Sequence, residues 1–203
     1  MSELSAAQIE SIARALCAGA VAVFATDTVY GIGTGAFCES SIQKIYTIKK
    51  RPLSMPLQIL VGSVAQACQI AHMPPAVQRV ACRYWPGALT LILKPSALGK
   101  RLLRGFSALG IRVPGHEVLT RLLAACTMPL ASTSANVHGQ PVLTQQEAVV
   151  ETFAGQVDYI LTDGVLPATA SSVLDVTAST PRLLREGSIL KTDLQQVLGI
   201  PIN

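Results

Sequence analysis

The chain has 203 residues, of which 50% are hydrophobic and 14% charged, a balance that favours a compact globule over a disordered chain. No apolar run approaches the roughly 18 residues needed to cross a bilayer, and no basic flank or cleavage pattern marks the N-terminus. The five cysteines form no CxxC pair, so neither a zinc site nor a disulfide framework is expected. We therefore expect a cytoplasmic protein with a single domain over residues 1–203 and no membrane contact.

The net charge of +4 is unevenly distributed along the chain. No Asp or Glu lies between Ser40 and His116. That segment holds Lys44, Lys49, Lys50, Arg51, Arg79, Arg83, Lys94, Lys100, Arg101, Arg104 and Arg112. These cations form either a solvated basic face on ordinary helices or a positive surface for a polyanion such as a nucleotide or RNA, and the charge pattern leaves both open.

The first part of the chain reads as helix, buried strand, turn and helix. Ser5 and Gln8 form a capping box that begins a helix, and Gly19 ends it. Residues 20–25 predict a strand covered on both faces. We interpret Gly31, Gly33 and Gly35 as turn residues that let backbone approach a ligand. A helix follows over residues 40–50 and is ended by Pro52.

The rest of the chain alternates helices with strands, and strands gather near its end. Strands are predicted over 57–61, 89–93, 109–113, 158–162, 171–176 and 182–185, and helices over 64–72, 76–84 and 118–126. Two further helices begin at capping boxes, Thr144 with Glu147 and Thr192 with Gln195. We expect residues 94–106 to form a mobile loop. The pattern predicts an α/β fold with a single twisted mixed sheet flanked by helices.

Short polar side chains cluster where predicted strands end, and ligands of α/β sheets bind at such ends. Residues 26–30, 132–136 and 171–172 supply hydroxyls, and Arg185 ends a later strand. Lys49, Lys50 and Arg51 end a helix, where cations complement the helix dipole. Each group has a plain structural reading as a turn, a cap or an exposed strand end. Together they also suit an anion, because Arg offers a planar fork and Lys a point charge.

Other patterns do not support a specific chemistry. Residues 31–36 fit G-x-G-x-x-A, but they lie too far beyond the strand and lack the expected acidic partner, so a dinucleotide site is rejected. No P-loop is present. His72, His116 and His138 lie near turns without motif partners, and we expect them at the surface. Without a nucleophile–base pair or metal-ligand spacing, the site is expected to act by positioning and electrostatics.

Seven motifs taken in order resemble the YrdC-like family of threonylcarbamoyl-AMP synthases. They are Thr26-Asp27-Thr28-Val29-Tyr30-Gly31, Ile48-Lys49-Lys50-Arg51-Pro52 with Pro56-Leu57, Trp85-Pro86-Gly87 with Leu89-Thr90, Ile111-Arg112-Val113-Pro114, Ser132-Thr133-Ser134-Ala135-Asn136 with Gly139, Ser171-Ser172-Val173-Leu174-Asp175 and Leu184-Arg185-Glu186-Gly187. The family often has Gly at the position of Lys50, and some members have Asn and His at those of Met55 and Leu60. The resemblance implies a YrdC-like sheet with a basic concave cleft, in the short form without an appended domain.

The resemblance also implies an activity and a set of site residues. Such enzymes make L-threonylcarbamoyl-adenylate and pyrophosphate from L-threonine, bicarbonate and ATP. The product then goes to a threonylcarbamoyl transferase complex that modifies the adenosine beside the anticodon of tRNAs reading codons that begin with A. By the match, Lys49 and Arg51 are catalytic; ATP contacts Lys49, Arg51, Thr90, Ser134, Asn136 and Arg185; and threonine contacts Thr28, Tyr30, Arg112, Ser132 and Ser171. Mg²⁺ would accompany ATP without a metal site of the protein's own.

Two other functions remain open from the sequence. An RNA-binding or ribosome-maturation module would use the basic segment without catalysis, although the aromatic content of 4% and the lack of an RNP-like motif weaken base stacking. A carbamoyl-adenylating domain like that of hydrogenase maturation proteins is a third reading, but those proteins carry zinc-finger cysteine pairs that this sequence lacks. Direct contact with tRNA stays open for both the synthase and the RNA-binding module.

Overall fold

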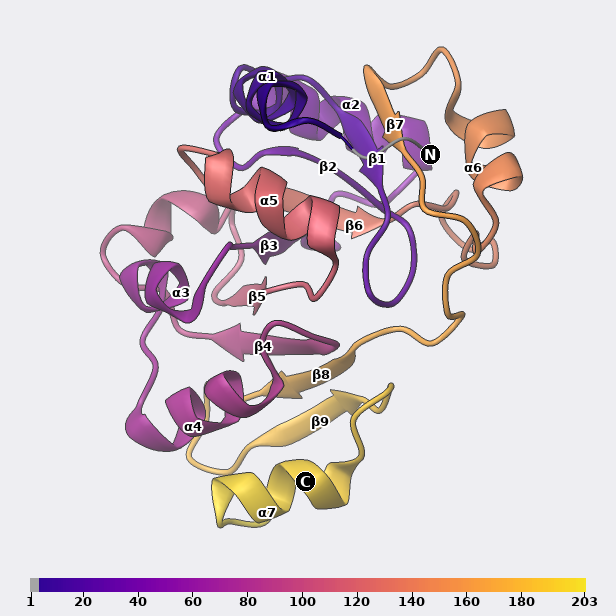
Figure 1. Ribbon diagram of the computed structural model, residues 1–203. Coiled ribbons are helices and arrows are strands. Elements are labelled where there is room, and N and C mark those ends of the chain that lie inside the picture. The colour runs from indigo at the N-terminus through magenta and orange to yellow at the C-terminus, as the bar shows by residue number, and fades with distance from the viewer. Residues whose placement is uncertain (1–3) are drawn as a thin grey trace.

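The computed structural model describes residues 4–203. Within that range one nine-stranded sheet runs in the order β7-β1-β2-β6-β3-β5-β4-β8-β9 (Figure 1). The pairs β1–β7, β3–β5 and β4–β8 are parallel and the other neighbours are antiparallel. The strands are β1 (Ala22–Phe24), β2 (Gly31–Gly35), β3 (Gln58–Leu60), β4 (Leu89–Leu93), β5 (Leu109–Arg112), β6 (Leu130–Ser134), β7 (Tyr159–Leu161), β8 (Ser172–Asp175) and β9 (Arg182–Arg185). The prediction of a single mixed sheet is confirmed.

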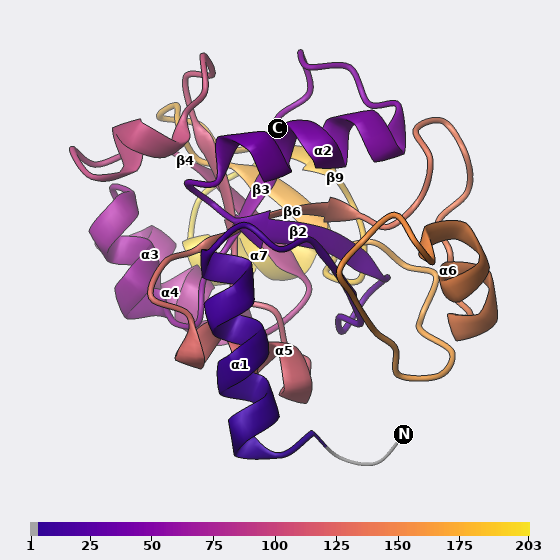
Figure 2. The same ribbon diagram turned by 90° about the horizontal axis from the view of Figure 1, so that it is seen from above.

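Helices cover both faces of this sheet. They are α1 (Ala6–Cys17), α2 (Glu39–Lys49), α3 (Val64–Ile70), α4 (Pro75–Tyr84), α5 (Glu117–Ala125), α6 (Gln146–Phe153) and α7 (Lys191–Leu198). Seen from above, α2 lies on one side of β2 and β6 and α1 on the other (Figure 2). α1 packs against α5, and α4 packs against α7 near β9 (Figure 1). No helix within residues 4–203 has both the length and the apolar character needed to cross a membrane.

The ends of the first two helices follow from local chemistry. The Ser5 hydroxyl accepts from the backbone N–H of Gln8, and the Gln8 side chain accepts from that of Ser5, so the predicted capping box is confirmed. Gly19 takes a φ of 105° just after α1, as a helix-ending glycine does. α2 ends before Pro52 is reached, because Lys50 adopts the left-handed conformation with a φ of 51°.

The glycine-rich segment is a strand, and its interpretation as a turn was wrong. β2 pairs with both β1 and β6. A Cβ built at Gly31 would lie 2.8 Å from the Phe24 ring, and one at Gly33 would lie 2.8 Å from the carbonyl oxygen of Ala131. A Cβ at Gly35 would lie 2.7 Å from the Leu16 carbonyl in α1. These glycines therefore let protein packing, rather than a ligand, approach the strand.

Three other local predictions also differ from the structure. α6 and α7 begin without a side-chain cap, so the capping boxes proposed for Thr144 and Thr192 are wrong. The segment 94–106 is not wholly irregular, because it contains a 3-10 helix at Gly99–Leu102 and buries Leu102. Arg104 in this segment forms an ion pair with Glu39 at 3.0 Å, which ties the segment to the start of α2.

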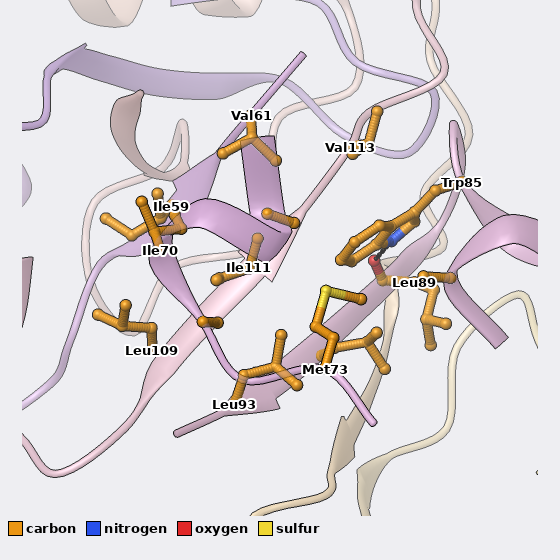
Figure 3. Close-up of a cluster of buried hydrophobic side chains, with 14 of the residues drawn as sticks. Ile59, Val61, Ile70, Met73, Trp85, Leu89, Leu93, Leu109, Ile111 and Val113 are labelled. Atoms are coloured by element: carbon orange, nitrogen blue, oxygen red, sulfur yellow. Dashed lines mark hydrogen bonds between the residues drawn. The ribbon is translucent and has the colours of Figure 1, made fainter. Parts of the chain in front are cut away.

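A large apolar cluster fills the layer on one face of the central strands (Figure 3). Trp85 lies in this cluster, and its indole N–H donates to the Leu89 carbonyl at 2.7 Å (Figure 3). In β4, Leu89, Leu91 and Leu93 are all buried in the cluster. Because side chains alternate across a strand, Thr90 and Ile92 point to the opposite face. That opposite face carries the cavity described next.

Candidate active site

One cavity of about 550 Å³ lies over the middle of the sheet. Six neighbouring strands contribute to its lining, among others with Ser132 of β6, Gln58 of β3, Gly110 of β5, Thr90 of β4, Val173 of β8 and Arg185 of β9. Loop residues 55–57 and 106–108 also line it. The volume falls within the roughly 300–1,000 Å³ typical of small-molecule sites. Strands far apart in sequence thus contribute to one site.

Arg112 is held at one side of this cavity by a buried ion pair. Its side chain is only 4% exposed, and its Nη2 donates to Asp27 Oδ1 at 2.7 Å. Nη1 donates to the Thr28 hydroxyl at 3.0 Å and Nε to the Gly87 carbonyl at 2.9 Å. Burial lowers the pKa of Arg112, and Asp27 opposes that shift. Among the described residues these bonds leave N–H groups on Nη1 and Nη2 available to an anion.

A connected set of polar groups lies on β4 and around β8 and β9, the strands beyond β5. The hydroxyls of Thr90 and Ser171 are 2.9 Å apart. Arg185 donates from Nη2 to the Ser171 hydroxyl at 3.1 Å and from Nε to the Ser171 carbonyl at 2.9 Å. Burial lowers the pKa of Arg185. The structure therefore brings together Ser171 and Arg185, which the sequence placed at separate strand ends, and Thr90, which the family resemblance pointed out.

Ser132 and Gln58 lie on the adjacent strands β6 and β3, next to β5, which carries Arg112. Ser132 is 1% exposed, and its hydroxyl has no hydrogen-bond partner among the described residues. Gln58 lies directly opposite Ser132 in the antiparallel pair β3–β6. Sequence reasoning missed Gln58, although a polar residue within the apolar run Leu57–Val61 is a visible signal.

Arg51 lies at the rim, where it also fastens a loop. Its Nη2 donates to the Pro56 carbonyl at 3.0 Å and its Nε to the Met55 carbonyl at 3.3 Å. Tyr46 donates to the same Met55 carbonyl at 2.8 Å. Burial lowers the pKa of Arg51. Ser134 lines the cavity nearby at the end of β6.

Lys49 and Asn136, which the resemblance assigns to ATP, are not among the residues that line the cavity. Lys49 is 1% exposed, and its ammonium donates to the carbonyls of Ser134 and Asn136. The Asn136 side chain accepts from the Ser134 hydroxyl at 2.6 Å and donates to the Gln140 carbonyl at 2.7 Å. Burial, helped by the charge of Arg51, lowers the pKa of Lys49 from 10.5 to about 8. In this structure both residues fix the loop that follows Ser134.

Tyr30, which the resemblance assigns to threonine, also lies outside the cavity lining. Its hydroxyl donates to the Gly164 carbonyl at 2.7 Å and accepts from the Asp163 backbone N–H at 3.1 Å. Burial raises the pKa of the Tyr30 phenol. The side chain thus fixes the chain segment that follows β7.

His116 is not the partnerless surface residue that the sequence suggested. Its side chain is 13% exposed, and Nε2 lies 3.0 Å from Asp163 Oδ2. Both residues line a separate hollow of about 200 Å³ beside Phe24 and α5. His116 does not line the larger cavity. The pair joins the segment before α5 to the segment after β7.

The electrostatic character of the larger cavity favours an anionic ligand. Within the described residues its charged lining side chains are all arginines, Arg51, Arg112 and Arg185. No group of three or more His, Cys, Asp or Glu side chains in residues 4–203 could hold a metal ion. The arginines and hydroxyls can bind and orient charged oxygens, which is the chemistry of positioning and charge stabilisation.

Comparisons with known proteins agree with this architecture. A sequence model of the Sua5/YciO/YrdC family, described as "Telomere recombination", matches residues 14–187. Threonylcarbamoyl-AMP synthases of Pyrococcus abyssi and Bacillus subtilis are 34% and 35% identical over 89% and 95% of this chain. The chain covers 54% and 57% of those two proteins, so it spans little more than half their length. A putative threonylcarbamoyl-AMP synthase of Mycobacterium leprae is 33% identical over 95% of this chain and 88% of its own length.

Solved structures show the same fold. The crystal structure of P. abyssi Sua5 complexed with L-threonine has a TM-score of 0.90 and 32% identity, covering 100% of this chain and 61% of that one. The structure of E. coli YciO has a TM-score of 0.86 and 25% identity, covering 95% of both chains. On the family match and these identities, this chain belongs to the Sua5/YciO/YrdC family.

Proposed function

We propose that this chain is a threonylcarbamoyl-AMP synthase, which makes L-threonylcarbamoyl-adenylate and pyrophosphate from L-threonine, bicarbonate and ATP. The observation that carries the proposal is one cavity in which arginines and hydroxyls from separate strands converge without a lining carboxylate among the described residues. Such a lining suits a carboxylate at one end and a polyphosphate at the other. The names of the relatives supply the substrate class, and L-threonine is bound in the related Sua5 structure.

The substrates are assigned to parts of the cavity by charge and by available donors. Threonine would lie near Thr28 and Arg112, whose remaining N–H groups can receive its carboxylate, with Ser132 and Ser171 toward the second substrate. ATP would lie near Arg51, Thr90, Ser134 and Arg185. Lys49 and Asn136 would hold the loop bearing Ser134, and Tyr30 the segment beyond β7.

The proposed reaction has two steps, and the residues act by orienting the reactants. The threonine nitrogen forms a bond to the bicarbonate carbon with loss of water, which gives a carbamate. A carbamate oxygen then attacks the α-phosphorus of ATP, and pyrophosphate leaves. Because a carbamate decomposes readily in water, formation inside a cavity preserves it. Arg51 and Arg185 would offset the charge that builds on the phosphates.

Magnesium would enter as part of the ATP substrate. The cavity lining holds no carboxylate in the described part of the chain, so the protein offers no acidic ligand there. Mg²⁺ commonly keeps several waters and binds through substrate phosphates. The product would supply a threonylcarbamoyl transferase complex for tRNA modification. A cytoplasmic location fits that role and belongs to the same proposal.

The test is incubation of the purified chain with ATP, bicarbonate and each amino acid in turn, with mass detection of the adenylate. Threonine should give the threonylcarbamoyl-adenylate together with pyrophosphate. Arg185→Ala should raise the KM for ATP by about tenfold to a hundredfold, because a charged hydrogen bond is worth about 1.5–3 kcal/mol. Arg182→Ala, on the exposed start of the same strand, is the matched control. Binding of tRNA without ATP consumption would instead favour an RNA-binding module.

A further inference from the structure

Gln58 of β3 lines the cavity between residues of β6 and β5. It faces Ser132 across the β3–β6 pair, and directly opposed residues of antiparallel strands share one face of the sheet. On its other side, a Cβ built at Gly110 would lie 3.9 Å from the Gln58 Cβ and 3.7 Å from the Thr90 Cγ2. The glycine therefore lets the side chains of Gln58 and Thr90 approach each other across β5.

The side-chain amide of Gln58 can donate hydrogen bonds to a ligand in the cavity. Its Oε1 lies 3.4 Å from the Thr90 hydroxyl, which can donate to it. No described residue accepts a hydrogen bond from its Nε2, and the side chain lines the cavity. Ser132 beside it is 1% exposed and has a hydroxyl with no partner among the described residues. Two neutral donors therefore stand together, and an unpaired buried hydroxyl is costly unless a ligand satisfies it.

Neutral donors at this place suit one particular part of the reaction. Arg112 and the Thr90–Ser171–Arg185 set lie on one side of Gln58, and Ser132 and Ser134 of β6 lie on the other. A ligand that spans the cavity therefore passes over Gln58, and we assign this place to the group that joins the two substrates. In the proposed reaction that group is the carboxylate of the carbamate. A cation would hold its oxygens more strongly and weaken their attack on phosphorus, whereas N–H and O–H donors orient them at a smaller electrostatic cost.

We propose that Gln58 is a substrate-positioning residue that, with Ser132, holds the bicarbonate-derived carboxylate for attack on the α-phosphorus of ATP. This role rests on the proposed synthase function. Gln58 makes no covalent bond: the threonine nitrogen takes the carbon of bicarbonate, water leaves, and the carbamate oxygen displaces pyrophosphate. The Gln58 amide supplies hydrogen bonds in both steps.

The test compares Gln58→Leu and Gln58→Glu with wild type in pyrophosphate release, while bicarbonate, threonine and ATP are varied separately. Both variants should lower kcat/KM for bicarbonate at least tenfold, while the Kd for threonine measured without bicarbonate stays within about twofold. Gln43→Leu, on the exposed face of α2, is the matched control and should behave as wild type. Ser132→Ala should have an effect that is less than additive with Gln58→Leu, because both donors serve one group.

Two results would overturn the assignment. One is an unchanged bicarbonate dependence in both Gln58 variants when wild type is active. The other is a weakened threonine Kd that accounts for the whole loss, which would move Gln58 into the threonine site. An inactive wild-type protein would instead refute the synthase function itself. Because glutamate has nearly the shape of glutamine, Gln58→Glu keeps the test decisive if the leucine variant does not fold.

Discussion

Replacing Asp27 by asparagine removes the charge beside Arg112 and keeps an oxygen in the same place. Asp27 Oδ1 accepts from Arg112 Nη2 at 2.7 Å and from the Gly115 backbone N–H at 2.9 Å, and the asparagine oxygen can accept both bonds. The packing and the hydrogen-bond count are therefore preserved. The change isolates the electrostatic contribution of Asp27 to a guanidinium that is almost fully buried.

The expected cost follows from the burial of the two partners. The Arg112 side chain is 4% exposed and that of Asp27 is 18% exposed. Two unit charges about 4 Å apart attract by about 4 kcal/mol at an effective dielectric constant of about 20, and breaking a buried pair typically costs about 3–5 kcal/mol. The retained hydrogen bond and the partial exposure of Asp27 reduce this value. We expect Asp27→Asn to lower the free energy of unfolding by about 2–4 kcal/mol.

The assay is urea unfolding followed by circular dichroism, with Tm as a second measure. For a chain of this length the loss corresponds to a Tm decrease of about 5–15 °C. Glu10→Gln is the matched control, because Glu10 pairs with Arg14 at 3.8 Å on the exposed surface of α1 and should change stability by less than about 0.5 kcal/mol. An Asp27→Asn effect as small as that of Glu10→Gln would refute the view that Arg112 depends on its carboxylate partner.

Three further predictions concern stability, each measured by urea unfolding. The pKa of Lys49 is about 8 in the fold and 10.5 as its ordinary value. Between these two pH values the unfolded chain binds more protons than the folded chain, so the contribution of Lys49 to the free energy of unfolding rises with pH. The free energy of unfolding of wild type, relative to that of Lys49→Met, should therefore rise by up to about 3 kcal/mol over this pH range. Free energies of unfolding that change with pH in the same way in both proteins would contradict this prediction. Lys50→Gly should stabilise by about 0.5–1 kcal/mol, because a left-handed φ of 51° strains lysine; a loss of stability would contradict it. Gly33→Ala should destabilise by about 1–3 kcal/mol, whereas Gly62→Ala, whose Cβ would meet atoms no closer than 3.4 Å, should cost less.

The glycine-rich strand shows how a local pattern was misread. Gly31, Gly33 and Gly35 repeat with the period of two that marks one face of a strand, which is consistent with β2. Glycine is usually depleted in strands, so propensity favoured a turn. The reason for glycine comes from elsewhere in the chain, since the Phe24 ring and the Leu16 carbonyl occupy the space of the missing side chains. That packing cannot be read from the segment itself.

Lys49 and Arg51 illustrate the same limit for a candidate site. Their spacing predicted two cations facing one anion, but α2 ends between them and Lys50 turns the chain. Lys49 then reaches backbone carbonyls of residues 134 and 136, which are distant in sequence. Ser171 and Arg185, which the sequence placed at separate strand ends, do meet in the structure, and Thr90, which only the family resemblance pointed out, lies beside Ser171.

The place of the cavity follows from a change of residue type along neighbouring strands. Leu60 lies opposite Leu130, and both pack in the apolar cluster that contains Leu119 and Leu122 of α5. Two positions along the same face, Gln58 lies opposite Ser132, and both line the cavity. The sheet is thus apolar where α5 covers it and polar where the cover ends. On one face of β3 and β6, the residue type changes at the same level of the sheet, from leucine to glutamine in β3 and from leucine to serine in β6. This joint change marks the place where the covering helix ends and the site begins. The sequence of one strand alone does not show it.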